Sequence, residues 1–220
     1  MESHRRSIAK AIGYRIFGSQ TTMLIALLAI ASSLGAGGCG NARKEEVLGA
    51  PPAALRLGYF ANLTHAQALV GTARGDFQRA LGDTKLETKI FNAGPSVVEA
   101  LFAGELDLAY IGPSPAINAY VKSRGRAVRI VSGSAANGVV VVARKESGIA
   151  KLQDLAGRRL ATPQFGNTQD LAARIYLTRT LGVKLKEDGG LTEILTVANA
   201  EQIGLFKAGQ LDAAWVPEPW

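Results

Sequence analysis

The stretch AGELDLAYIGPSP at residues 103–115 and the stretch AGQLDAAWVPEPW at residues 208–220 share one pattern. In each, Ala-Gly follows a segment with helical spacing, Leu-Asp opens an apolar run that contains an aromatic residue, and a proline-bearing loop follows. Glycine commonly ends a helix, and a short apolar run is typical of a buried strand. The repeat therefore predicts two similar helix–strand–loop joints, one in each half of the chain.

Short apolar runs alternate with helical patterns on both sides of these joints. Strands are predicted at residues 55–60, 86–91, 106–112, 128–133, 158–163, 191–197 and 211–216, and helices at residues 65–81, 95–102, 114–123, 168–181 and 200–207. This alternation predicts an α/β fold, with parallel sheets covered by helices on both faces. The β-branched run GVVVVARK at residues 138–145 lies between the two halves, and we place a hinge near residues 139–143. We expect one α/β unit at 55–140 and a second, incomplete one at 141–220.

The proline-bearing loops are the best candidates for a binding site. In open parallel sheets, ligands bind at the carboxyl ends of the strands. Two similar units that face each other would place the loops 112–115 and 217–220 on opposite walls of one cleft. Chance similarity of two helix–strand joints is the alternative that the repeat alone leaves open.

The N-terminus has the features of an export signal. Arg5, Arg6, Lys10 and Arg15 precede the apolar run MLIALLAIASSL at 23–34, and small residues lead to Cys39. The run is shorter than the about 20 apolar residues of a membrane-spanning helix, so residues 1–38 are interpreted as a signal peptide. Whether export follows the general or the twin-arginine route stays open. Residues 39–54 mix charge, glycine and proline, as a flexible tether would.

Cys39 is the single cysteine of the chain. Its position after AGG resembles the lipobox of bacterial lipoproteins, although Ala36 stands where leucine is usual. The resemblance implies that Cys39 is lipidated and anchors the protein to a membrane of the cell envelope. An ordinary cleaved signal followed by a free thiol is the alternative.

Composition and motifs disfavour two other classes of function. The formal net charge is +7, but part of it lies in the leader, and the remaining Lys and Arg are scattered among Asp and Glu without a basic helix face. We therefore expect no nucleic-acid partner. The sequence has no nucleophile elbow, no paired histidines at metal spacing and no glycine-rich phosphate loop, so we expect no catalytic residues, no metal and no cofactor.

Four stretches carry a family resemblance that covers nearly all of 55–220. GYFANLTHA (58–66), FNAGPSVVEALFAGELDLAYIGPSPAINAY (91–120), GNTQD (166–170) and DAAWVPEPW (212–220) resemble substrate-binding proteins of ABC importers in the aliphatic sulfonate, taurine and nitrate group. The resemblance implies a type II periplasmic-binding-protein fold of two Rossmann-like half-domains. It also implies an exported monomer that traps a small anionic solute and delivers it to the permease subunits of an ABC transporter. Such a fold needs further chain after Trp220, so we expect the sequence to be part of a longer protein.

The same resemblance implies twelve ligand-contacting residues, which are Asn62, Leu63, Thr64, His65, Gly112, Pro113, Ser114, Gly166, Asn167, Thr168, Gln169 and Glu218. Thr64, Ser114 and Thr168 are also placed to begin helices directly after strands. Helix N-termini carry unpaired N–H groups and partial positive charge, so several that converge can hold an anion. For each of them, a helix cap that faces water is the alternative. Glu218 suits an anion poorly and would bind an amine or orient another donor.

The identity of the solute stays open at this level. Sulfonates, nitrate, bicarbonate and thiamine precursors are all bound within the broad group that the chain resembles. An enzyme or sensor domain of the same fold that binds a thiamine-precursor-like molecule is the competing interpretation. The thiamine-pyrimidine branch would call for a cysteine-rich motif, and a transcription regulator for an N-terminal helix-turn-helix. The sequence has neither feature.

Overall fold

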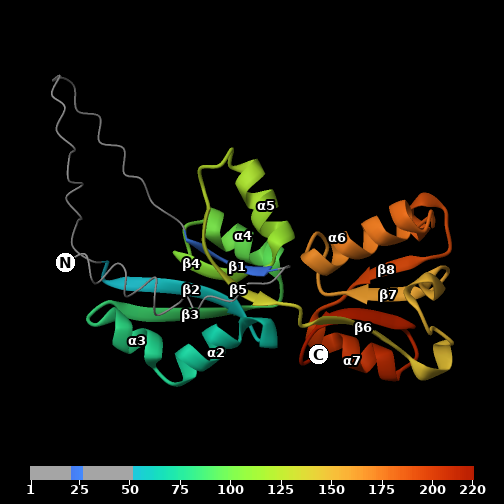
Figure 1. Ribbon diagram of the computed structural model, residues 1–220, viewed down its shortest axis with the longest axis horizontal. Helices are drawn as coiled ribbons and strands as arrows, with labels where there is room; N and C mark the ends of the chain where they lie inside the picture. Colours follow the sequence, from blue (N-terminus) through green and yellow to red (C-terminus); the bar gives the residue numbers. More distant parts are fainter. Residues whose placement is uncertain (1–20, 27–51) are drawn as a thin grey trace.

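The computed structural model describes residues 21–26 and 52–220. These residues form two α/β units that lie side by side, each with helices on both faces of a sheet (Figure 1). The chain passes from the first unit to the second between strands β5 and β6, through Asn137 and Gly138. Both residues have positive φ, 64° and 80°, a conformation that glycine adopts freely and that few other residues adopt.

The first unit has a five-stranded sheet in the order β3-β2-β4-β1-β5. Strands β2, β3 and β4 are parallel, whereas β1 pairs antiparallel with both β4 and β5. Its elements are β1 (Thr21–Ala26), β2 (Ala54–Phe60), η1 (Leu63–His65), α2 (Ala66–Ala73), α3 (Asp76–Leu81), β3 (Lys85–Phe91), α4 (Gly94–Phe102), β4 (Leu108–Ile111), α5 (Pro113–Lys122) and β5 (Arg129–Ala136).

Strand β4 shows how the first core is built. Leu108 and Tyr110 pack with Phe77 on the side of α2 and α3, whereas Ala109 and Ile111 pack with Val97 on the side of α4 and α5. Successive strand residues point to opposite faces, so an uninterrupted apolar run fits a strand that is covered on both sides. The sequence run at 106–112 is explained by this double burial.

The second unit repeats this plan with a four-stranded sheet in the order β6-β9-β7-β8. Helix α6 covers one face and α7 the other (Figure 1). Its elements are β6 (Val139–Ala143), η2 (Lys145–Ser147), η3 (Leu152–Leu155), β7 (Arg159–Thr162), α6 (Thr168–Ile175), the π-helical segment η4 (Tyr176–Thr180), η5 (Lys186–Asp188), β8 (Glu193–Thr196), α7 (Asn199–Lys207) and β9 (Ala213–Pro217).

The aspartate of each repeated Leu-Asp is part of a clamp within the sheet. Asp107 accepts hydrogen bonds from the backbone N–H and the guanidinium of Arg56 at 2.7 to 2.9 Å. Asp212 does the same with Arg159 at 2.8 to 3.0 Å, and each arginine also donates to the carbonyl of the repeated glycine, Gly104 or Gly209. Arg56 lies in β2 and Arg159 begins β7, the first parallel strand of each unit, so this part of the repeat serves the fold rather than the cleft.

Two expectations from the sequence are corrected. The helix expected at 65–81 is two helices, because Gly75 at φ 69° breaks it and Phe77 then packs against Gly71. The sheets are mixed rather than parallel, since β6 runs antiparallel to β9. The segment predicted as a hinge, residues 139–143, forms strand β6, and the crossing between the units lies just before it.

Within the predicted export signal, the structure describes only Thr21–Ala26, as strand β1 between β4 and β5. The rest of that segment and Cys39 lie outside the described residues. No helix in the described part of the chain is both long and apolar enough to cross a membrane.

Candidate functional site

A cavity of about 280 Å³ lies between the two units. The first turns of four helices meet at its wall, namely α4 at Gly94, α5 at Pro113, α6 at Thr168 and α7 at Asn199. Two of these helices follow parallel strands of the first unit and two follow parallel strands of the second. The carboxyl ends of both sets of strands therefore face one space, as the positions of the repeated loops predict.

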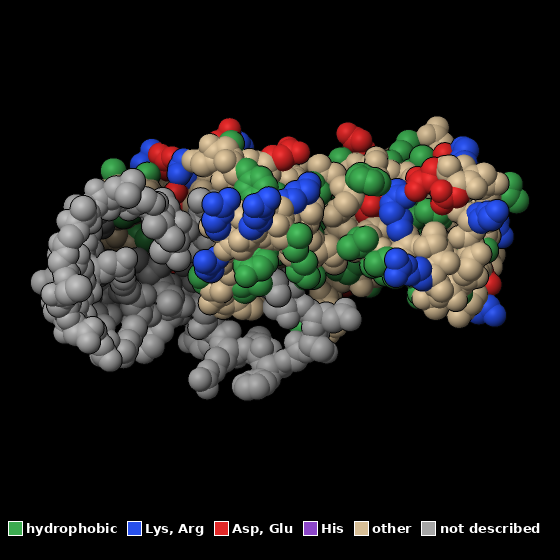
Figure 2. Space-filling view, turned by 90° about the horizontal axis from the view of Figure 1, so that it is seen from above, with side chains coloured by type: hydrophobic (Ala, Val, Ile, Leu, Met, Phe, Trp, Pro, Cys, Tyr) green, Lys and Arg blue, Asp and Glu red, His purple; other side chains and the backbone are tan. Residues whose placement is uncertain are grey.

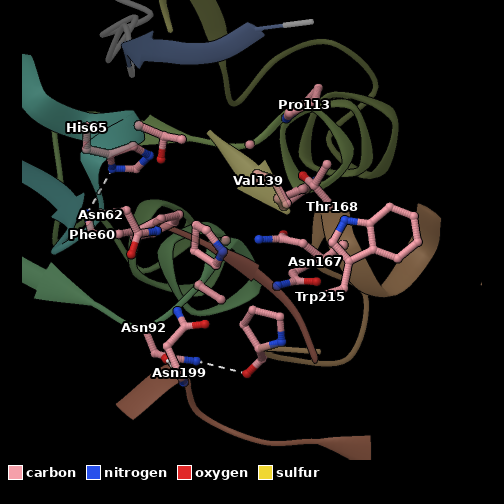
Figure 3. A pocket seen from close by; sticks show the side chains of 18 of the residues that line it. Phe60, Asn62, His65, Asn92, Pro113, Val139, Asn167, Thr168, Asn199 and Trp215 are labelled. Atoms are coloured by element: carbon pink, nitrogen blue, oxygen red, sulfur yellow. Dashed lines mark hydrogen bonds between the residues drawn. The ribbon is translucent and has the colours of Figure 1, made fainter. Parts of the chain in front are cut away.

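The polar side chains in the lining are all neutral (Figure 3). Its polar members are Asn62, Thr64, His65, Asn92, Asn137, Asn167, Thr168, Gln169 and Asn199. Its apolar members include Phe60, Pro113, Val139 and Trp215. Among the described residues that line the cavity, no Lys, Arg, Asp or Glu is present. Amide and hydroxyl groups and helix N-termini are therefore the groups that could bind a polar ligand here.

His65 is a neutral part of this wall. Its ring is 1% exposed and stacks on Phe60 with 4.4 Å between ring centroids. Its Nδ1 accepts a 2.9 Å hydrogen bond from the Phe60 backbone N–H, which requires that nitrogen to be unprotonated. Burial lowers the pKa of His65 to about 3. The imidazole therefore fixes the end of β2 and stays uncharged at neutral pH.

The start of α6 offers free donors to the cavity. Asn167 caps the helix by accepting a 2.8 Å hydrogen bond from the Asp170 N–H through its own Oδ1. The N–H groups of Thr168 and Gln169, in the first turn, have no partner within the helix. The Thr168 hydroxyl is buried without a hydrogen-bond partner. The α5 start is poorer in donors, because Pro113 and Pro115 lack N–H groups.

The two units touch beside this donor group. A Cβ atom added to Gly112, at the start of α5, would come within 2.3 Å of Thr168 Oγ1. Only glycine allows the first turns of α5 and α6 to approach so closely. On the side of the crossing, the Leu63 N–H donates to the Glu218 carbonyl at 2.8 Å, and the Trp220 indole donates to Asn62 Oδ1 at 3.0 Å.

The structure brings most of the sequence-predicted site residues to the cavity. Asn62, Thr64, His65, Gly112, Pro113, Asn167, Thr168 and Gln169 line it. Leu63, Ser114, Gly166 and Glu218 do not lie among the lining residues. Leu63 and Glu218 instead join the units through their backbones, and the Gly166 N–H donates to the Asp170 carboxylate at 2.9 Å.

Sequence reasoning missed Asn92, Asn199 and Trp215 as lining residues. The sequence could have indicated Asn199, because the similarity between the two halves includes the helix before each repeated Ala-Gly. Helix α4 at Gly94–Phe102 corresponds to α7 at Asn199–Lys207, so both helices begin at the same point of their unit. Asn92 precedes α4 by two residues and had no counterpart in the second unit to draw attention to it.

Solved structures share the fold of this chain. The alkanesulfonate-binding protein SsuA from Xanthomonas axonopodis pv. citri, bound to MOPS, superposes with a TM-score of 0.59 at 23% identity, covering 78% of this chain and 56% of that one. The periplasmic nitrate-binding protein NrtA from Synechocystis PCC 6803 gives a TM-score of 0.55 at 17% identity, covering 76% of this chain and 47% of that one. The α/β fold of this chain thus matches that of periplasmic binding proteins.

Relatives in sequence are also binding proteins rather than enzymes. The taurine-binding periplasmic protein of Escherichia coli K12 is 28% identical over 152 residues, which are 69% of this chain and 45% of that protein. A binding protein of Brucella abortus is 29% identical over 133 residues, which are 60% of this chain and 38% of that protein. This chain therefore spans less than half the length of either relative. The sequence model of the NMT1-like family matches residues 48–220, and the chain belongs to that family.

Proposed function

We propose that this protein is an extracytoplasmic solute-binding protein that holds a small organic anion, such as a sulfonate, in the cavity between its two units. The observation that carries the proposal is the meeting of four helix N-termini at one uncharged, amide-rich wall. Helix N-termini stabilise an anion through unpaired N–H groups without a charged side chain. The relatives named for taurine and alkanesulfonate support this class of solute.

The size of the cavity favours an anion with an organic part. A volume of about 280 Å³ lies just below the roughly 300–1,000 Å³ of typical ligand pockets, so the cavity suits a small ligand. Trp215 and Phe60 provide apolar wall that a bare oxyanion would leave uncovered. Taurine or an alkanesulfonate would place its charged group at the helix starts and its carbon atoms against these rings.

Calorimetric titration with taurine, hexane-1-sulfonate and nitrate tests the proposal. We expect the organic sulfonates to bind more tightly than nitrate. Thr168→Ala should weaken their binding about ten- to hundred-fold, because a hydrogen bond to a charged group contributes about 1.5 to 3 kcal/mol. Ser123→Ala, outside the cavity lining, is the matched control. Absence of binding by all three anions would refute the proposed class of solute.

A neutral heterocycle related to the thiamine pyrimidine is the second candidate. The uncharged lining favours it, because amide side chains can pair with the donors and acceptors of a heterocycle and Trp215 offers an aromatic face. A 4-amino-pyrimidine added to the same titrations separates the two candidates. Binding of this probe without binding of any sulfonate would assign the cavity to the neutral ligand.

We further propose that the protein is exported, anchored through a lipid on Cys39, and passes its solute to an ABC permease. The basic leader, the apolar run and the small residues before Cys39 support export and lipidation. Cleavage before Cys39 would remove β1, so that strand would belong to the precursor and not to the lipidated form. The periplasmic relatives support an extracytoplasmic location. Radiolabelled palmitate should label the wild type and not Cys39→Ser. Equal labelling of both would refute the anchor while leaving the solute site untouched.

The surface above the cleft suits delivery to a permease. Ile117 and Val121 on α5 and Leu171 and Ile175 on α6 are exposed apolar side chains, contributed by both units. Figure 2, which looks down on the molecule from above, shows hydrophobic side chains among Lys, Arg, Asp and Glu. A partner that contacts both units at once would sense whether they are closed.

A further inference from the structure

One side chain of the first unit makes two hydrogen bonds to the backbone of the second. Asn92 follows β3 at the edge of the cavity, next to Asn199 (Figure 3). Its Nδ2 donates to the Pro163 carbonyl at 3.0 Å, and its Oδ1 accepts from the Asn199 backbone N–H at 3.1 Å. Both polar atoms of Asn92 are therefore used between the units.

The bond to Asn199 has the geometry of a helix cap supplied by the other unit. Asn199 is the first residue of α7, and the residue before it, Ala198, has no side chain that could cap the helix. A helix start leaves N–H groups without an intrahelical partner. Asn92 satisfies one of them only while the units are together. If the units separate, both that N–H and the Pro163 carbonyl lose their hydrogen bonds to Asn92 and must bond to water instead.

Asn199 connects this bond to the cavity. The residue is 3% exposed and lines the cavity, and its Oδ1 is buried without a hydrogen-bond partner. Its backbone is thus held by Asn92, while its side-chain amide remains for a solute. A solute bound to that amide would hold the same residue that Asn92 holds through the backbone. Solute binding and the Asn92 hydrogen bond would therefore stabilise each other.

We propose that Asn92 is a closing latch, a positioning residue that holds the second unit over the cavity and links solute binding to closure. The link to solute binding rests on the proposed function, whereas the role of Asn92 in holding the two units together does not. Ser96 and Gln164 form a neighbouring pair, with Gln164 Nε2 donating to Ser96 Oγ at 3.0 Å. That pair uses two side chains, whereas Asn92 binds two backbone groups of the second unit, which every substitution there except proline at position 199 leaves in place.

Asn92→Ala is the primary test, with taurine as the probe. Loss of two hydrogen bonds between the units should raise the dissociation constant about ten- to thirty-fold, mainly through faster dissociation. Spin labels on Val121→Cys and Ile175→Cys, in a Cys39→Ser background, report the distance between exposed sites on α5 and α6. Without taurine, Asn92→Ala should populate longer distances than the parent, and saturating taurine should restore the short one.

A second variant separates the latch from simple helix capping. Ala198→Ser in the Asn92→Ala background gives α7 a cap of its own, since serine is a favoured N-cap residue. We expect this double variant to recover thermal stability but neither the short label distance nor the taurine affinity. Recovery of both by Ala198→Ser, or an Asn92→Ala protein with unchanged distances, would overturn the latch. If taurine does not bind even the parent, the proposed solute class fails, and the distances measured without solute still decide the latch.

Discussion

His65 shows how one buried residue can serve the wall of a binding site without contributing charge. Its Nδ1 accepts from Phe60, and its ring fills the space between Phe60 and Tyr110. The sequence predicted a ligand contact at His65 from a resemblance. It could not predict the neutral state, because that state follows from burial by strands distant in the sequence. The same limit applies to Asn92, whose two partners lie 71 and 107 residues away.

The neutral state of His65 predicts a specific acid sensitivity. Its pKa of about 3 in the folded protein lies below 6.5, so the unfolded chain binds more protons between these values. The stabilisation is present above pH 6.5, and stability should fall by about 1.4 kcal/mol per pH unit below it. Urea unfolding at pH 7.5, 6 and 5 measures this slope. His65→Asn keeps an acceptor for the Phe60 N–H without titrating in this range, so its slope should be shallower; equal slopes would contradict the assignment.

The uncharged lining makes a separate prediction about binding. No described lining residue changes its charge between pH 5.5 and 8.5, because His65 remains neutral. The affinity for hexane-1-sulfonate, which stays ionised throughout, should therefore be constant over this range. Calorimetry at four pH values checks it. A ten-fold change in affinity would mean that a titrating group contacts the anion.

At the scale of elements, the repeated joints are the part of the fold that the sequence predicted best. The apolar runs give the strands β4 and β9, and the Ala-Gly pairs give the helix ends before them. Their partners were harder to predict, because the antiparallel pairing of β6 depends on where the chain crosses between units. The Asp107 and Asp212 clamps were likewise invisible, since each arginine lies about fifty residues away.

The Asp212 clamp should be measurable as stability. Hydrogen bonds from the side chain and the backbone N–H of Arg159, together with its positive charge, lower the pKa of Asp212 to about 2. The Asp212 side chain is 11% exposed. Asp212→Asn should cost about 2 kcal/mol in urea unfolding at pH 7, with the difference shrinking as pH falls from about 4 toward 2. Glu87→Gln, in the exposed pair with Lys85, should cost under about 0.5 kcal/mol. Equal effects of the two substitutions would show that the clamp contributes little.

At the scale of the whole molecule, we expect solute binding to depend on the contact between the first turns of α5 and α6. A Cβ at Gly112 would approach Thr168 Oγ1 to 2.3 Å, so Gly112→Ala should push these turns apart. We expect hexane-1-sulfonate to bind about ten-fold more weakly, with little change in the unfolding free energy of either unit. Gly204→Ala is the control, because a Cβ there meets nothing within 4 Å. An unchanged affinity for Gly112→Ala would show that the contact is not needed for binding.

The central claim is that a solute binds between the two units, against the wall that contains Trp215. The chain has two tryptophans, and Trp220 can be replaced by phenylalanine to leave Trp215 as the single indole. Titration of Trp220→Phe with hexane-1-sulfonate, followed by tryptophan emission, is the most direct measurement. We expect a saturable change in Trp215 emission, with the same dissociation constant as calorimetry gives. Calorimetric binding with no change in Trp215 emission would place the solute elsewhere and contradict the account.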